Sequence, residues 1–394
     1  MGDATTDRVV MCVDMDAFYA SVELRRHPEW RDVPMWVGGA TRGVVLSANY
    51  PARAFGVRGG MSSTQARRLC PHAVCAPPDF DAYTEVSTGI VAVLETFAAR
   101  VESASIDEAY LDLTGTERTA GSATRLGERL RAVIHDEQGI ACSVGIGPNK
   151  LIAKMASNSA KPDGLLQVLP EAVTGFLAPQ PVEHLIGVGG STGSRLRALG
   201  LVTIADLAAV PRGVLQREFG LRAGAVLADL ARGTDHSRVV ARPGERGVGC
   251  QETFGHDLSE DAAVHAELLR VVVKVSSRMR AAGVLGRTLT LTLRFADFAT
   301  TSRASTLAFP TDLTDELYPV ALRLYALLRT GRRRVRRVGV RVTGLVDREA
   351  VALQPTLDAP DHGWRDAERA ADNVIRRFGP RAAQRAVLTA RKRP

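Results

Sequence analysis

The sequence predicts an α+β protein with several domains. With 394 residues, the chain is too long for one ordinary hydrophobic core. Residues 1–169 show a split βαβ order of strands and helices, which is typical of a ferredoxin-like layer. A strand-helix-strand-strand-helix-strand order returns in residues 248–348, and the residues between these parts are almost wholly helical. Together these observations predict a ferredoxin-like layer, a helical domain and a separate βαββαβ domain.

The first domain is expected to open on a buried strand. The apolar run Val9 to Val13 ends directly in Asp14-Met15-Asp16, so this strand would deliver carboxylates at its C-terminal end. Residues 20–79 are broken by Gly and Pro and indicate an insertion rather than a regular layer. Apolar spacing predicts the remaining elements in order: a helix at 84–99, strands at 101–106 and 109–113, a helix around Leu126 to Ile134, and a strand at Ile140 to Ile146.

The rest of the chain divides where periodicity is lost. Residues 170–236 are helical, and residues 237–247 carry charge, Pro and Gly, as an interdomain linker does. The run Arg287 to Phe295 alternates cleanly, which indicates a sheet with one solvated face. The expected elements are strands at 248–254, 286–298, 301–309 and 335–345, helices at 260–282 and 312–330, and a tail at 349–394 with a docking or folding helix marked by Trp364, Ala367, Ala370 and Val374.

Composition bounds the partners and the compartment. The net charge of +8 and the pI of about 9.6 favour a polyanion, without choosing between DNA, RNA and an acidic membrane. No apolar run reaches the roughly 18 residues that span a membrane, and the N-terminus lacks the order of a signal peptide. Five scattered cysteines suit a reducing compartment, and Cys70, His72 and Cys75 lack further ligands at zinc-like spacing. A cytoplasmic protein is therefore expected, and a monomer is the default expectation where the sequence does not show the oligomeric state.

Two acidic motifs stand where strands end. Asp14 and Asp16 point to one side of an extended strand because side chains alternate, although alone they also fit an Asx turn. Asp107-Glu108 falls at a tight strand-to-strand connection, where adjacent acids would ordinarily be a solvated turn. In a split βαβ sheet these strands are neighbours, so Asp14, Asp107 and Glu108 can converge. Converging carboxylates repel unless cations are present, and a pair of hard cations such as Mg²⁺ suits phosphoryl transfer.

A third set of residues carries groups that bind phosphate. SANYPAR at 47–53 places the hydroxyl of Ser47, the phenol of Tyr50 and the guanidinium of Arg53 close together, and Lys161 follows in SAKPDG. Arg and Lys near a developing phosphate charge would stabilise a pyrophosphate leaving group. Taken alone, Arg53 and Lys161 also fit ordinary surface cations.

At this point the sequence resembles the Y family of DNA polymerases, most closely its bacterial polymerase IV type. The resemblance covers about residues 8–345 and implies a palm (1–19 and 80–169), small fingers (20–79), a thumb (170–236) and a little finger (248–348). The segments that carry it appear in family order: DMDAFYASVE, SANYPARAFGVRGGM, SIDEAYLDLT, GIGPNKLIAKMAS and SAKPDG.

The resemblance also implies roles for single residues. Asp14, Asp107 and Glu108 would bind two Mg²⁺ or Mn²⁺ ions, and the Met15 carbonyl would complete one site. Tyr19 would be the steric gate under the sugar of a dNTP. The family assigns no metal role to Asp16, and Leu46 stands near the nascent base pair where many relatives carry a smaller residue. The residues implied to bind the triphosphate are Ser47, Tyr50, Arg53, Lys161 and the backbone around Phe18.

Two further motifs point to DNA. LIGVGGSTGSRL at 185–196 lacks the Lys of a P-loop and resembles a helix-hairpin-helix, in which Gly187 and Gly189 would meet a phosphate. A bare interhelical turn is the alternative. The run GRRRVRRVGVRV at 331–342 starts a strand whose alternation places Arg332, Arg334 and Arg336 on one face, either solvated or in contact with phosphates.

The function expected from all these features is low-fidelity, template-directed DNA polymerisation in translesion synthesis, without proofreading, on primer-template DNA. In the tail, Gln354 and Leu357 resemble a degenerate sliding-clamp-binding peptide, although Asp358 stands where a bulky apolar residue is usual. One rival is a catalytically silent DNA- and clamp-binding protein, which would lack the carboxylates. Another is a nucleotide cyclase, which has no use for a DNA-binding hairpin or an arginine-rich second domain.

Overall fold

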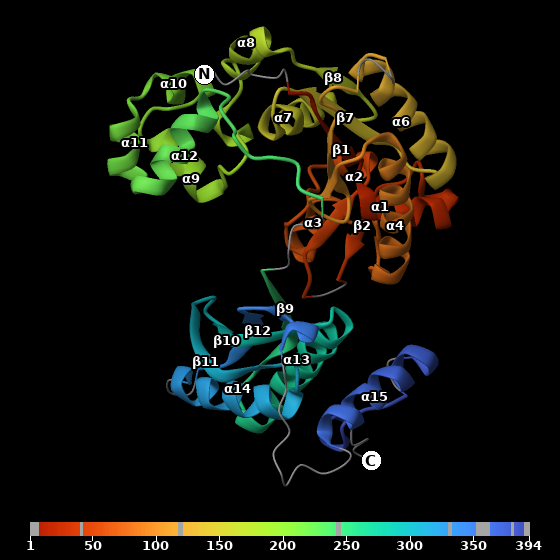
Figure 1. Ribbon diagram of the computed structural model, residues 1–394, viewed down its shortest axis with the longest axis vertical. Helices are drawn as coiled ribbons and strands as arrows, with labels where there is room; N and C mark the ends of the chain where they lie inside the picture. The colour runs from red at the N-terminus through yellow and green to blue at the C-terminus, as the bar shows by residue number, and fades with distance from the viewer. Residues whose placement is uncertain are drawn as a thin grey trace. The chain divides into compact units, whose positions relative to one another are not determined.

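The chain forms two compact units, Met1–Pro243 and Gly244–Pro394, each with its own core (Figure 1). The structure is a computed structural model that describes residues 8–39, 42–116, 121–241, 246–329, 333–351, 363–379 and 382–389. No helix within these ranges is long and apolar enough to pass through a membrane.

A five-stranded sheet is the centre of the first unit. Its strand order is β5-β6-β1-β7-β8, so the first strand of the sequence lies in the middle between two antiparallel neighbours. All six residues of β1 are buried, which explains its nearly continuous apolar run. The strands are β1 (Val10–Met15), β5 (Val101–Ser103), β6 (Glu108–Asp112), β7 (Cys142–Gly147) and β8 (Leu165–Gln167).

Helices cover both faces of this sheet. The helices α4 and α6 pack on the face that carries Met11, whereas α7 packs on the opposite face, where Ala153 meets Val10. Gly145 permits this close approach, because a Cβ there would lie 2.0 Å from the Ala153 carbonyl oxygen. Side chains alternate along β1, so Asp14 lies on the α7 face with Val10. The bounds are α4 (Phe80–Phe97), α6 (Ala123–Gln138) and α7 (Lys150–Ala160).

The segment at 20–79 is a small regular layer, which corrects the expectation of an irregular insertion. A three-stranded sheet of order β3-β2-β4 packs around its own core, which includes Trp36, Val45 and Cys70. Its strands have three or four residues, too short for alternation to show in the sequence. The elements are β2 (Met35–Gly38), β3 (Val45–Ala48), β4 (Val74–Ala76), α1 (Phe18–Arg26), α2 (Tyr50–Ala54) and α3 (Ser63–Leu69).

The segment expected to be helical is helical. Its core continues into α7 through Leu151, Ile152 and Met155, which joins this domain to the sheet. The main helices are α8 (Val173–Leu177), α9 (Gly190–Ala198), α10 (Ile204–Ala209), α11 (Arg212–Phe219) and α12 (Leu221–Ala231), with a 3-10 turn η3 at Val182–His184.

The second unit is a four-stranded antiparallel sheet of order β11-β10-β12-β9 with helices on one face. Leu289, Leu291 and Leu293 point to the helices, as the alternation in this strand predicts. The bounds are β9 (Gly247–Leu258), α13 (Asp261–Ala281), β10 (Val284–Phe295), β11 (Thr300–Thr311), α14 (Thr314–Leu328) and β12 (Val335–Thr343).

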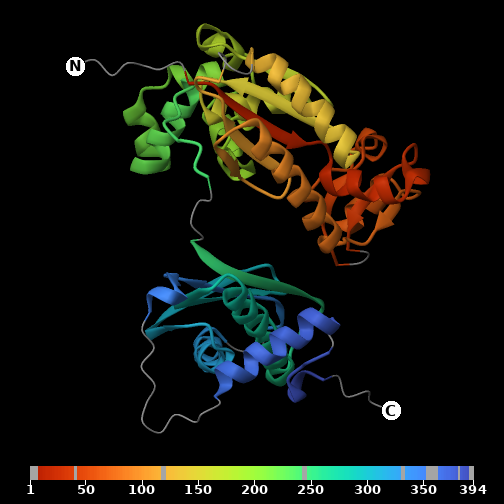
Figure 2. The same cartoon turned by 45° about the vertical axis from the view of Figure 1, so that its right-hand side comes forward.

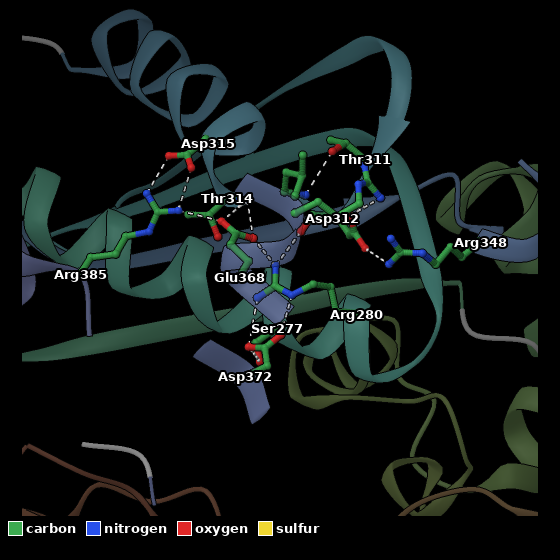
Figure 3. Close-up of polar contacts among 12 residues, drawn as sticks. Ser277, Arg280, Thr311, Asp312, Thr314, Asp315, Arg348, Glu368, Asp372 and Arg385 are labelled. Atoms are coloured by element: carbon green, nitrogen blue, oxygen red, sulfur yellow. Dashed lines mark hydrogen bonds and ion pairs between the residues drawn. The ribbon is translucent and has the colours of Figure 1, made fainter. Parts of the chain in front are cut away.

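The C-terminal helix α15 (Trp364–Phe378) lies on the helical side of this sheet, next to α13 (Figure 2). The apolar positions that marked it in the sequence are not its buried side: the exposed fraction of Trp364 is 65%, whereas that of Glu368 is 7%. Glu368 and Asp372 pair instead with Arg280 of α13 (Figure 3). The helix is therefore docked through buried charges rather than through an apolar stripe.

Candidate active site

The strand register brings two of the expected carboxylates together. Asp14 of β1 is the direct partner of Glu108 of β6, and residues opposite one another in an antiparallel pair share a face. Glu108 opens β6 rather than lying in the connection before it. Asp107 immediately precedes this strand, and its carbonyl accepts a hydrogen bond of 2.9 Å from the Met15 N–H. Asp14 and Glu108 therefore face one another where β1 ends, and the main chain of Asp107 is tied to the same end of the strand.

Two ammonium groups neutralise these carboxylates. Lys154 Nζ contacts Asp14 Oδ2 and lies 2.9 Å from Glu108 Oε2, and Lys161 Nζ lies 2.5 Å from Asp14 Oδ1. Burial lowers the pKa of Lys154, but the negative charge of Asp14 and the hydrogen bonds to Asp14 and Glu108 together outweigh this effect, so its pKa is raised above the ordinary value. Lys154 was not among the residues expected from the sequence.

Asp16 supports this arrangement from behind. It is buried and accepts hydrogen bonds from Ser143 Oγ of β7 at 3.0 Å and from the Asp163 N–H at 2.7 Å. Lys161 Nζ lies 3.5 Å from Asp16 Oδ1. These contacts tie the end of β1 to β7 and to the loop after α7, which agrees with a structural role.

The candidate phosphate-binding residues of the small layer reach the same region. Ser47 lies in β3, next to its last residue, and Tyr50 and Arg53 lie on α2, which Asn49 caps. The Arg53 guanidinium lies over the Tyr50 ring, 4.9 Å from its centroid, and Arg53 Nε donates to the Ala48 carbonyl. Burial and the negative charge of Asp16 raise the pKa of Tyr50 to about 12, so this phenol stays neutral. Because the charge of Asp16 acts on the pKa of Tyr50, the Tyr50 phenol lies beside the acidic centre.

Tyr19 lies on the first turn of α1, directly after the acidic strand. Its ring packs against Tyr83 at 4.6 Å and Phe80 at 6.1 Å between centroids. Burial and the charge of Asp107 raise its pKa. Phe18 is buried in the core beside it, and Leu46 packs against the same core. Tyr19 is thus packed between these rings at the edge of the acidic centre.

The donors of this centre are all oxygen atoms: carboxylates and main-chain carbonyls. Hard divalent cations prefer such donors, so the residues present fit Mg²⁺ or Mn²⁺. Within the described ranges no three His, Cys, Asp or Glu side chains are gathered as a metal-binding group, and two ammonium groups contact the carboxylates. Cys70 contacts His72 at 3.5 Å, while Cys75 faces the Gly38 carbonyl.

The hairpin glycines lie where a phosphate could approach. Gly187 has a φ of +90°, which favours glycine, and Gly189 is the N-cap of α9 without a side-chain cap. Both are exposed, and a Cβ at Gly189 would meet nothing within 4 Å. The N–H groups at the start of this helix are therefore open to an anion.

The arginine run does not alternate as expected. The strand begins at Val335, after Arg334, and the register shifts between Val335 and Arg337. Arg336 lies at this irregularity, 3.6 Å from Asp257 and over the Phe298 ring. The β-bulge breaks the two-residue period on which the expectation of one shared face for Arg334 and Arg336 rested, so alternation does not assign these two side chains to one face. Arg332, Gln354 and Leu357 lie outside the described residues.

After the bulge, the open face of the second sheet carries other arginines. Arg294 and Arg337 are cross-strand partners, and burial together with Arg294 lowers the pKa of Arg337. None of the described positions that the continuous strand register assigns to this face is acidic. The register assigns to it Thr288, Thr290, Thr292, Arg294, Thr300, Ser302, Ala304, Thr306, Arg337, Gly339, Arg341, Thr343, Gly247, Gly249, Gln251 and Thr253.

Comparison with known proteins agrees with this architecture. The chain matches the impB/mucB/samB family over residues 13–158, the C-terminal domain of that family over residues 245–357, and the thumb domain of DNA polymerase iota over residues 183–235. It is 41% identical to DNA polymerase IV of Halorhodospira halophila, covering 86% of this chain and 96% of that protein. DNA polymerase IV of Desulfatibacillum aliphaticivorans is 38% identical, with 97% of each chain covered.

A solved structure is similar as well. A Y-family DNA polymerase chimera of Dbh and Dpo4 gives a TM-score of 0.79 at 27% identity, covering 86% of this chain and 99% of the chimera. The predicted fold class, with palm, fingers, helix-hairpin-helix thumb and little finger, is confirmed. The chain therefore belongs to the impB/mucB/samB family, the Y family of DNA polymerases.

Proposed function

We propose that this polymerase extends DNA primers on a template with low fidelity, acts in translesion synthesis and does not proofread. One observation carries the proposal: Asp14 and Glu108 face one another at the end of β1, where the main chain of Asp107 is also tied and where the Tyr19 ring senses the charge of Asp107. Primer extension joins a 3′-hydroxyl to the α-phosphorus of a dNTP and releases pyrophosphate, so negative charge must be stabilised on both oxygens.

Asp14, Asp107, Glu108 and the Met15 carbonyl would hold two divalent cations. When bound, such ions supply Lewis-acid stabilisation of the attacking and leaving oxygens. The neighbouring side chains bind and orient. Asp16 keeps the loop after α7 in place through its hydrogen bond from the Asp163 N–H.

The triphosphate would lie between the small layer and the loop after α7. Arg53 offers a planar guanidinium and Tyr50 a neutral phenol that can donate a hydrogen bond, with the Ser47 hydroxyl nearby. Lys161 would leave Asp14 to bind a phosphate when a nucleotide enters. The Lys161 ammonium would thus neutralise the Asp14 carboxylate in the free enzyme and a phosphate of the nucleotide in the bound enzyme.

DNA binding would use both units. The hairpin at Gly187 and Gly189 offers main-chain N–H groups to a phosphate, and the acid-free sheet face offers Arg294, Arg337 and Arg341. Such contacts are independent of sequence and weaken with salt. Low fidelity fits the small fingers, whose strands have at most four residues. Recruitment through Gln354 and Leu357 by a sliding clamp completes the proposal.

Primer extension by the full chain tests this function directly. On an undamaged template with Mg²⁺ and dNTPs, we expect extension whose sequence follows the template, and no removal of a mismatched primer end. A well-folded chain that binds DNA without extending the primer would support the silent accessory protein instead. Conversion of a nucleoside triphosphate to a cyclic monophosphate would support the cyclase.

Replacing Tyr19 by alanine is expected to relax sugar selection. The ring is clamped by Tyr83 and Phe80 and cannot yield to a 2′-hydroxyl. Its removal should raise the ratio of ribonucleotide to deoxyribonucleotide kcat/KM on the order of a hundredfold. Phe is the matched control, since Tyr19→Phe keeps the ring and should keep the selection. An unchanged ratio in Tyr19→Ala would place the gate elsewhere.

Arginines of the open sheet face are expected to set the salt dependence of DNA binding. Each of Arg337→Ala and Arg341→Ala should weaken the affinity for DNA duplexes of unrelated sequence by the same factor. Each should also reduce the magnitude of the slope of log affinity against log salt concentration by ~0.9. Fluorescence anisotropy over a salt series measures this slope. Arg303→Ala is the matched control, because Arg303 is the partner of the inward-facing Leu291. Equal slopes in all variants would exclude this face from DNA contact.

A further inference from the structure

Lys154 stands in the acidic centre at the position of a bridging cation. Its Nζ contacts Asp14 Oδ2 and Glu108 Oε2 at the same time, and these two oxygens come from residues directly opposite one another in the sheet. The exposed fractions of the three side chains are 16%, 10% and 19%, so the cluster is mostly shielded from water. The remaining oxygen of Glu108 faces the buried Cys12 thiol at 3.8 Å.

The backbone holds Lys154 firmly in this place. Asn149 caps the start of α7 through the Ile152 N–H and donates to the Gly233 carbonyl, while Asp235 accepts from the Leu151 N–H. The helix therefore cannot easily turn the Lys154 side chain away. Residues at spacings of three and four share one helix face, so Lys150, Ala153, Lys154 and Ser157 all face the sheet or its edge.

Two carboxylates held opposite one another repel unless a cation lies between them. Lys154 supplies that cation within the chain. A divalent ion held by the same two carboxylates would need lone pairs that the ammonium occupies, so ammonium and metal ion would compete for them. Removing the ammonium also removes a positive charge that opposes the metal ion through space.

We propose that Lys154 is a positioning residue that keeps Asp14 and Glu108 together in the free enzyme and competes with divalent cations for these two carboxylates. This inference rests on the proposed metal role of these carboxylates. It makes the metal affinity of the free enzyme the outcome of a competition with an internal ammonium. It also assigns Lys154 a role apart from Lys161, whose ammonium contacts the other oxygen of Asp14.

Binding of Mn²⁺ to the full chain without DNA or nucleotide tests the inference. Free Mn²⁺ can be followed by its paramagnetic resonance signal, and thermal melting in EDTA reports the stability of the free site. In Lys154→Met we expect a lower melting temperature in EDTA and a Mn²⁺ midpoint reduced about tenfold. Added Mn²⁺ should then raise the melting temperature of Lys154→Met by more than it raises that of the wild type.

Lys150→Met is the matched control, one helical turn earlier. Lys150 is paired with Glu102 at 2.7 Å and lies over the Tyr110 ring, away from Asp14. Its loss should lower the melting temperature but leave the Mn²⁺ midpoint unchanged. Lys154→Arg keeps the charge in a planar group that binds carboxylates well, so its midpoint should rise above that of the wild type.

The outcomes separate this inference from the proposed function. If Mn²⁺ binds the wild type but not Asp14→Ala, and Lys154→Met has an unchanged or higher midpoint, the role of Lys154 is overturned while the metal site stands. If the wild type shows no Asp14-dependent Mn²⁺ binding, both the metal site and the inference fail. Should Lys154→Met not fold, a midpoint in Lys154→Arg at or below that of the wild type overturns the inference alone.

Discussion

Replacing Asp107 by alanine is expected to reduce primer extension by on the order of a thousandfold or more, while DNA affinity is retained. Asp107 would bind metal ions that stabilise charge only as the reaction proceeds, so its loss should appear in kcat. The fold should survive the change. The side chain accepts a hydrogen bond from Ser105 Oγ, whereas the tie to the Met15 N–H uses the main-chain carbonyl, which alanine keeps.

Single-turnover extension under saturating dNTP measures this effect, with DNA affinity followed by anisotropy. Asp112→Ala is the matched control on the same strand, because Asp112 pairs with Arg100 at 3.6 Å at the far end of β6. It should extend primers like the wild type. Extension that persists in Asp107→Ala would contradict the assignment of the metal site and point to other carboxylates.

The acidic centre could be predicted from the sequence because its elements carry strong local signals. An apolar run that stops at Asp14 indicates a buried central strand, and a split βαβ order makes it the neighbour of the strand that Glu108 opens. Side-chain alternation then orients both carboxylates. Arg53 and Lys161 were predicted as phosphate-binding cations from their own motifs, whereas Tyr19 was added by the family resemblance.

Other features needed the three-dimensional structure. The contact of Lys154 with Asp14 can be predicted only when α7 is known to cover the face of the sheet that carries Asp14. The bulge before Arg337 shifts the alternation by one residue, and local sequence gives no sign of it. The buried Glu368 reverses the usual expectation for an amphipathic helix, because its partner Arg280 lies 88 residues away along the chain.

Replacing Arg280 by alanine is expected to destabilise the second unit by about 3–5 kcal/mol, the usual cost of leaving a buried charge without its partner. The exposed fraction of its side chain is only 6%, and it serves several acceptors at once (Figure 3). It contacts Glu368, lies 2.6 Å from Asp372 Oδ2 and donates to the Asp312 carbonyl at 3.0 Å. Alanine would leave two carboxylates under α15 without this counter-ion.

Denaturant unfolding of the full chain, followed by circular dichroism, measures the change in the transition of the second unit. Lys274→Ala is the matched control on the same helix, since its pair with Glu252 is exposed and should contribute at most about 1 kcal/mol. Glu368 also accepts hydrogen bonds from Arg385 at 2.7 Å and from the Thr314 N–H. The amide oxygen of Glu368→Gln can still accept from both of these donors. This variant should therefore lose less stability than Arg280→Ala. A loss in Arg280→Ala no larger than in Lys274→Ala would mean that α15 contributes little to the stability of this unit. A large loss, by contrast, would make the C-terminal helix part of the little finger rather than an appendage.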